Sequence, residues 1–139
     1  MSALETLIRV HRWQLDERRQ QLGELDRLAD KLRLERRRLD EEDAAEQRAA
    51  ALSHEASLAY PSYAAALRDR RAKLDASIAE VDDQILRARD ALAEAFQEVK
   101  RYELAASNRA KRARDALTRK QTIEQDEIAL QMHRRNRAG

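Results

Sequence analysis

Apolar residues recur along this chain in alternating steps of four and three, the spacing that places them on one face of an α-helix. In the first half, eight of eleven such positions are apolar, and the exceptions are His11, Arg18 and Arg36. In the second half, all nine positions are apolar or aromatic. Period-two alternation is nowhere sustained, so no strand is predicted. The pattern predicts two long helices, each with one coiled-coil seam. The seams are Leu4, Ile8, His11, Leu15, Arg18, Leu22, Leu25, Ala29, Leu32, Arg36 and Leu39, and then Ile78, Val81, Ile85, Ala88, Leu92, Ala95, Val99, Tyr102 and Ala106.

The region between the two seams contains the only proline of the chain, Pro61. Proline disfavours helical geometry at the preceding residue and lacks a backbone donor, so it favours a break between helices. We expect a first helix over about residues 3–58, a corner at 59–62 with Ser62 as a cap, and a second helix over about 63–134. A hairpin lets one seam bury the other, whereas a straight, kinked helix needs partner chains for both. The predicted fold class is all-α, a single long antiparallel two-helix coiled-coil hairpin.

The position of the corner also sets the expected pairing of the two arms. The residue numbers of any two residues that face each other across the arms should then add up to about 121. Ala29 is expected near Leu92, and Arg18 opposite Glu103. The expected core comprises Leu15, Leu22, Leu25, Leu32, Val81, Ile85, Leu92, Phe96, Val99 and Tyr102.

The seam spacing is irregular close to the corner. Leu39, Glu42 and Ala45 follow one another in steps of three, and an extra step of four runs from Leu74 to Ile78. Such insertions locally overwind or unwind a coiled coil. We therefore expect weaker packing and a bend where residues 40–46 face residues 74–81.

The two predicted arms differ in length, so the second helix overhangs at the C-terminus. The segment beyond about residue 118 has no partner in its own chain, yet it carries Ile123, Ile128, Leu130 and Met132. An isolated amphipathic helix is marginally stable in water. We expect another protein to cover this end.

The amino-acid composition further limits the class of protein to which this chain can belong. Charged residues make up 39% of the chain, aromatic residues 4%, and the net charge is +2. The chain is rich in Ala, Leu, Arg, Glu and Gln, which are strong helix formers. Its composition is therefore not that of a disordered chain. There is no cysteine, no signal-type apolar region and no apolar run of the roughly 20 residues that a membrane helix needs. We expect a soluble, intracellular chain without direct membrane insertion.

A search for chemistry finds no catalytic or metal-binding motif. His11, His54 and His133 are too far apart to form a common site, and a two-helix rod has no water-excluding pocket. We expect no enzymatic activity, no metal, no cofactor and no small-molecule substrate. Basic clusters occur at 33–39 and 108–120, but acidic residues follow them and no aromatic side chains interleave to stack bases, so nucleic-acid binding is disfavoured.

Tyr60 and Tyr63 flank Pro61, with Leu58 and Leu67 close by in sequence. They either cap the end of the hairpin or form a docking surface, since tyrosines are favoured interface anchors.

Three stretches together give the sequence a family resemblance. "LIRVHRWQLDERRQQLGEL" at the N-terminus, "AYPSYAAAL" at the corner, and "KRYE" at 100–103 followed by "DEIALQ" at 126–131 resemble the flagellar export protein family FliJ, in its short alphaproteobacterial form. The resemblance spans nearly the whole chain.

The resemblance implies a cytoplasmic antiparallel coiled coil at the inner-membrane base of the flagellum, similar to the stalk of rotary ATPases. The end with both termini would enter the hole of the export ATPase hexamer and regulate it, and the other end would meet the export gate protein FlhA. Export chaperones are further implied partners. By position in the hairpin, the ring contacts would be Leu4, Ile8, Ile123, Ile128 and Leu130, and the gate contacts Tyr60, Tyr63, Leu67 and Leu74.

Three other interpretations stay open at this point. Stalk proteins of virulence type III secretion share the shape that the resemblance implies. Without the resemblance, the residues also allow a generic structural coiled coil, such as a parallel dimer of kinked helices. They allow a nucleic-acid-binding coiled coil as well.

Overall fold

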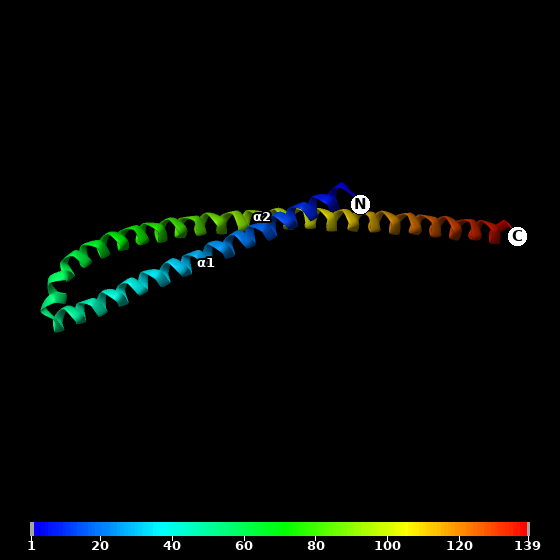
Figure 1. Ribbon diagram of the computed structural model, residues 1–139. Coiled ribbons are helices and arrows are strands. Elements are labelled where there is room, and N and C mark those ends of the chain that lie inside the picture. Colours follow the sequence, from blue (N-terminus) through cyan, green and yellow to red (C-terminus); the bar gives the residue numbers. More distant parts are fainter. Residues whose placement is uncertain (1, 139) are drawn as a thin grey trace. The chain divides into compact units, whose positions relative to one another are not determined.

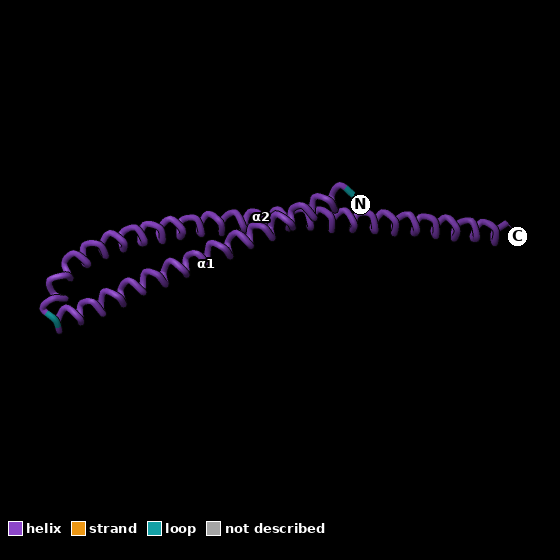
Figure 2. The backbone as a smooth tube through the Cα atoms, in the orientation of Figure 1, coloured by secondary structure: helices purple, strands orange, loops and turns teal. Residues whose placement is uncertain are grey.

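A computed structural model describes residues 2–138 of the chain. Helix α1 runs from Ala3 to Leu52, and helix α2 runs from His54 to Ala138 (Figures 1 and 2). The fold is all-α, with two long helices packed against each other and the second helix longer. The fold class expected from the seams is therefore confirmed.

The helix boundaries differ from the expected ones, because α1 ends at Leu52 and the break between the helices lies at Ser53 and not at the predicted corner 59–62. The Ser53 N–H still donates to the carbonyl of Ala49 (3.1 Å), as in a continuing helix. The Ser53 Oγ then accepts from the N–H of Ala56 (3.3 Å), and its carbonyl accepts from the N–H of Ser57 (3.0 Å). One residue thus closes α1 and caps α2, the role that was expected of Ser62.

Pro61 lies inside α2 and does not separate two helices. Its ring removes one backbone donor and clashes with the preceding turn, so proline in a helix produces a bend. The first turns of α2, which include residue 61 by number, curve across the end of α1 before α2 runs back alongside it (Figure 1). The chain therefore reverses through a capped break at Ser53 followed by a curved helical segment.

We expected a single coiled-coil unit, and the structure divides into two compact units. The first, here called the hairpin unit, comprises residues 13–95 with the reversal. The second, the terminal unit, comprises the N-terminal segment up to Arg12 and the chain from Phe96 onward. Both helices contribute to each unit.

The core of the hairpin unit is made by the predicted seams but in a different register. Ala29 is 2% exposed and clusters with Val81 and Ile85. It was expected near Leu92, which lies seven residues beyond Ile85. Ion pairs between the arms agree with the observed register, with Arg33 on Asp82 (2.6 Å) and Arg36 on Asp75 (2.8 Å). A displacement of one heptad leaves both seams facing inward, which is why the apolar pattern alone did not distinguish the two registers.

The seams continue through the region where an irregularity was predicted. Glu42 and Ala45 are exposed, and the chain buries Asp43 instead, four residues after the buried Leu39. The seam of α2 likewise includes Arg71, three residues before Leu74. The predicted change of spacing was wrong, because Asp43 on α1 and Arg71 on α2 keep the regular steps of four and three.

In the terminal unit, the start of α1 packs on α2 through a stacked pair and an ion pair. The rings of His11 and Tyr102 stack with centroids 4.7 Å apart, and Arg12 bonds to Glu103 (3.1 Å). Glu103 was expected opposite Arg18, which instead donates to Gln21 within its own helix.

Other members of the predicted core divide by burial. Leu15, Val81, Ile85 and Val99 are buried, whereas Leu22, Leu25, Leu32, Leu92 and Tyr102 are half-buried. Phe96 is 45% exposed, so its assignment to the core was wrong; the ammonium group of Lys100 lies 5.3 Å from its ring centroid.

A capping box begins α1. The Ser2 Oγ accepts from the N–H of Glu5 (3.2 Å), and a Glu5 carboxylate oxygen accepts from the N–H of Ser2 (3.3 Å). This S-x-x-E arrangement satisfies backbone donors that the first turn otherwise leaves free.

Candidate partner-binding surfaces

A buried polar cluster joins the two arms of the hairpin unit near the reversal. Asp43 is 8% exposed and accepts hydrogen bonds from three side chains. The donors are the hydroxyl of Tyr60 (2.8 Å), the amide of Gln47 (3.1 Å) and the guanidinium of Arg71 (3.2 Å). We call Asp40, Asp43, Gln47, Tyr60 and Arg71 the polar layer.

Asp40 extends the polar layer to the surface. It accepts from Arg71 (2.7 Å) and also bonds to Arg36 in its own helix. Hydrogen bonds from the guanidinium groups of Arg36 and, to a lesser extent, Arg71 hold the pKa of the Asp40 carboxyl below its ordinary value. The pKa of Arg36 is raised in turn by its hydrogen bonds to Asp75 and Asp40. The layer therefore holds its charges in paired form.

The predicted gate contacts lie in and around this layer. Tyr60 is half-buried, and its hydroxyl donates to Asp43 and accepts from Gln47. Leu67 is 2% exposed and Leu74 is half-buried, so Leu67 belongs to the core and not to an accessible surface. Tyr60 and Tyr63 are both half-buried near the reversal, and a docking role for them stays a prediction.

Tyr63 is half-buried, and its ring lies 6.1 Å from that of Tyr60. Burial raises the pKa of its hydroxyl above the ordinary value, and the nearby carboxylates of Glu42, Glu46 and Asp43 add to this effect. The apolar side chains that do reach solvent near the reversal are Leu52, 89% exposed, and Leu58, 69% exposed.

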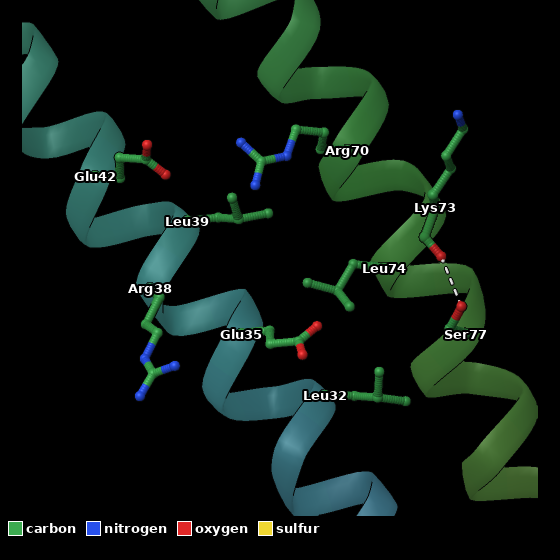
Figure 3. A pocket seen from close by; sticks show the side chains of 9 residues that line it. All are labelled: Leu32, Glu35, Arg38, Leu39, Glu42, Arg70, Lys73, Leu74 and Ser77. Atoms are coloured by element: carbon green, nitrogen blue, oxygen red, sulfur yellow. Dashed lines mark hydrogen bonds between the residues drawn. The ribbon is translucent and has the colours of Figure 1, made fainter.

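A groove runs between the arms of the hairpin unit on one side, and Figure 3 shows its lining. Leu32, Leu39 and Leu74 form the apolar floor. Glu35 and Glu42 lie on the α1 side, and Arg70 and Lys73 on the α2 side. In Figure 3, Arg70 and Glu42 point toward each other across the groove, while Arg38 and Lys73 point away from it. The groove is an open, charged channel and contains no converging catalytic set.

The longest exposed surface belongs to the terminal unit. The start of α1 reaches Ala113 of α2, where Ser2, Leu4 and Glu5 share a shallow groove with Ala106, Arg109, Ala110 and Ala113. Every residue from 114 to 138 is exposed. We call residues 114–138 the overhang; they form the orange-to-red end of α2 in Figure 1.

Apolar side chains occupy two faces of the overhang. Ile123 and Leu130 are seven residues apart and share one face, and both are more than half exposed. Ile128 lies about 140° around the helix from Ile123, at 100° per residue. Leu117 and Met132 lie on the same side as Ile128. A partner that uses all of these groups has to contact the helix from more than one side.

Charge along the overhang is segregated into blocks. Residues 114–120 contain three basic side chains and one acidic, residues 121–132 contain three acidic and none basic, and residues 133–138 contain three arginines. The overhang therefore presents blocks of opposite charge as well as exposed apolar side chains.

The predicted ring contacts at the start of α1 are less accessible than those of the overhang. Ile8 is 8% exposed and Leu4 is half-buried, so both pack within the terminal unit. Trp13, in the hairpin unit, is 60% exposed.

The sequence matches the protein family described as Flagellar FliJ protein over residues 1–138. The chain belongs to the FliJ family. Neither the curated proteins nor the solved structures gave a match. The resemblance inferred from the sequence is thereby confirmed at the level of the family, while the alphaproteobacterial subtype stays a prediction.

Membership in the FliJ family makes this chain a component of the flagellar export apparatus, in association with the export machinery. FliJ proteins are structural, non-enzymatic members of that apparatus. Within the described residues, no helix combines the length and the apolar character needed to cross a bilayer.

Asp43 and Arg71 are the residues that sequence analysis missed. Their signal was present, because each continues the four-and-three spacing of its seam. The predicted seams instead continued from Leu39 to Glu42 and stepped directly from Leu74 to Ile78.

Proposed function

We propose that this chain is a stalk of the flagellar export apparatus that links the export ATPase hexamer to the export gate protein FlhA. It promotes export and handles export chaperones without catalysing a reaction itself, in the cytoplasm at the inner-membrane base of the flagellum. The overhang enters the ring, and the reversal end of the hairpin unit faces the gate. Secondary-structure elements can carry energetic coupling between distant sites, and α2 contributes to both units of this chain.

The distribution of apolar groups on the overhang is the observation that carries this proposal. Ile123 and Leu130 lie on one face and Ile128 on another, and all of them are exposed. A partner that lies along one face, as in a two-stranded coiled coil, covers only one of these sets. A hole that surrounds the helix covers both. The ring of the export ATPase offers such an enclosure.

Two pairs of substitutions test whether the partner encloses the overhang. The first, Ile123→Ser with Leu130→Ser, removes one face, and the second, Ile128→Ser with Met132→Ser, removes the other. We expect both to weaken co-sedimentation with the export ATPase and its stimulation by about tenfold or more, since each removes two buried aliphatic groups worth about 1.5–3 kcal/mol apiece. The matched control, Gln121→Ser with Gln125→Ser, should bind like the parent chain.

Deleting residues 118–139 should abolish both association and stimulation. Full activity of the truncated chain would show that the overhang is not the ring contact. Loss in only one of the two paired variants would show a one-sided partner and would contradict the ring.

At the gate end, the accessible apolar groups are Leu52 and Leu58, whereas Tyr60 and Tyr63 are half-buried. We expect Leu52→Ser with Leu58→Ser to weaken binding to the cytoplasmic part of FlhA without lowering the melting temperature. Unchanged binding would place the gate contact elsewhere on the chain.

A further inference from the structure

The hairpin unit buries two opposite charges at facing seam positions. Asp43 continues the seam of α1 after Leu39, and Arg71 continues the seam of α2 before Leu74. Their side chains meet at 3.2 Å, with 11% of the Asp43 side chain and 26% of the Arg71 side chain exposed. Coiled-coil seams normally hold apolar residues, and a polar residue there lowers stability.

The polar layer is built so that few of its groups remain unpaired. Asp43 accepts from residues of both arms, since Gln47 lies on α1 while Tyr60 and Arg71 lie on α2. Gln47 also donates to the Tyr60 hydroxyl (3.1 Å). The network satisfies these groups only while Asp43, Tyr60 and Arg71 face one another.

The remaining seam does not distinguish registers one heptad apart. The register expected from the apolar pattern places Ala29 against Leu92, whereas the structure places it with Val81 and Ile85. Both arrangements bury aliphatic side chains against aliphatic side chains. Pro61 also offers a second position for the reversal, because its missing donor favours a break there.

A slip of one heptad does change the surroundings of the polar layer. In one direction Asp43 faces Ile78 and Arg71 faces Ala50. In the other direction Asp43 faces Ala64, and Arg71 faces another arginine, Arg36. Either slip buries a charge without its partner, which costs several kcal/mol.

The layer is not optimised for stability. Within the layer, the Arg71 Nε is buried without a hydrogen-bond partner among the described protein groups, and so is the hydroxyl of the neighbouring Tyr63. Replacing a buried ion pair by well-packed apolar residues is often neutral or stabilising. An apolar pair at residues 43 and 71 would therefore suit stability at least as well, and the charges serve another purpose.

We propose that the Asp43–Arg71 polar layer fixes the register of the hairpin, so that α1 and α2 align in one of several registers that the apolar seams alone allow. A buried polar residue that specifies alignment at a cost in stability is a known device of coiled coils. Here it lies next to the reversal, where an error in alignment would begin.

Disulfide trapping tests this proposal, because the chain contains no cysteine of its own. Arg33→Cys with Asp82→Cys reports the observed register, since the two positions face each other and their native side chains form an ion pair there, with 2.6 Å between Arg33 Nη2 and Asp82 Oδ1. Arg33→Cys with Arg89→Cys, and Arg33→Cys with Asp75→Cys, report slips of seven residues in the two directions. Each pair is oxidised in dilute glutathione redox buffer, and the intramolecular product is measured by mass spectrometry.

With the polar layer intact, we expect the disulfide from position 33 to position 82 to dominate. In the background Asp43→Leu with Arg71→Leu, we expect the slipped disulfides to increase at least about tenfold, with helicity and melting temperature kept or raised. The matched control, Glu41→Leu with Arg68→Leu, makes the same change in charge at two exposed positions and should trap only the observed register.

If the leucine pair traps only the observed register, the polar layer does not fix it. The same conclusion follows if the control gains slipped products to the same extent. Should the leucine pair fail to fold, Asp43→Ala alone removes the acceptor that Gln47, Tyr60 and Arg71 share, and it must still raise the slipped products above the parent level. No rise in that variant would also overturn the proposal.

Discussion

Asp43 and Asp83 are both paired carboxylates, but they lie in opposite environments. Asp83 pairs with Arg87 one turn along the helix, with 54% and 77% of the two side chains exposed. Exposed pairs of this kind contribute little, because water and salt screen them. Asp43 is buried and holds three donors in place. Its removal leaves Tyr60 and Arg71 without that acceptor.

The first prediction compares these two carboxylates. Asp43→Ala should lower the free energy of unfolding by about 2 kcal/mol, because buried donors lose their acceptor. Arg71 retains Asp40, which limits the loss. Asp83→Ala should change it by less than about 0.5 kcal/mol. Urea unfolding followed by circular dichroism measures both values; equal effects would mean that the layer is not protected from water.

The second prediction concerns acid. Hydrogen bonds from Arg12, and then from Lys100, hold the pKa of Glu103 below its ordinary value, and Arg36 does the same for Asp40. A carboxylate with a lowered pKa stabilises the folded state above the pKa of the unfolded chain, and this stabilisation is lost as pH falls through the lower folded-state value. The melting temperature should therefore fall as the pH drops below the ordinary values of 4.5 for Glu103 and 3.8 for Asp40.

Glu103→Gln separates this effect from a general acid response. The variant should melt at a lower temperature than the parent at neutral pH and lose less on acidification, so that the two curves converge at low pH. Parallel curves over the whole pH range would show that the Arg12–Glu103 pair contributes nothing to the acid dependence.

At the scale of the helices, the chain reverses at the Ser53 cap and not at Pro61, where the sequence predicted the corner. Ser53 supplies an acceptor for the first turn of α2 and a donor for the last turn of α1. Pro61 lies two turns further on, inside α2. The break and the bend are thus two separate features, whereas a single corner was expected.

The third prediction distinguishes the two serines near the reversal. Ser53→Ala should cost about 1 kcal/mol of unfolding free energy through the lost N-cap. Ser62→Ala should be neutral or slightly stabilising, because residue 62 is an exposed position inside α2 and alanine is the better helix former. Thermal and urea unfolding of both variants decide the matter. A larger loss for Ser62→Ala would restore the corner at residues 59–62.

The sequence analysis succeeded for quantities that repeat every heptad and failed for those that do not. All nine positions of the second seam are buried or half-buried, and so are those of the first seam apart from Arg18. The pairing of Ala29 was displaced because a heptad slip preserves every seam position. Asp43 and Arg71 were missed for a related reason: only the facing partner makes a buried charge tolerable, and the partner depends on the register.

At the scale of the whole chain, burial ends well before the sequence does. The last half-buried residue is Ala106, and all residues from 107 to 138 are exposed although they are helical. Helices without tertiary contacts are marginal in water, because nucleation is costly and each added residue contributes little. The threonines at 118 and 122 bond to carbonyls one turn earlier, which adds no contact outside the helix.

The overhang should therefore behave differently from the hairpin core in solution, and this is the fourth prediction. In hydrogen exchange read by mass spectrometry, amides of residues 118–138 should exchange at least about a hundredfold faster than those around Ala29 and Ile85, where opening requires loss of packed contacts. Addition of the export ATPase should slow exchange in residues 118–138 and leave the amides around Ile85 unchanged, because a ligand protects the segment that it binds. The paired variant Ile123→Ser with Leu130→Ser should not gain this protection, whereas Gln121→Ser with Gln125→Ser should. If the free overhang already exchanges as slowly as the core, it is stable without a partner, and its exposed apolar faces would no longer indicate that another protein encloses it.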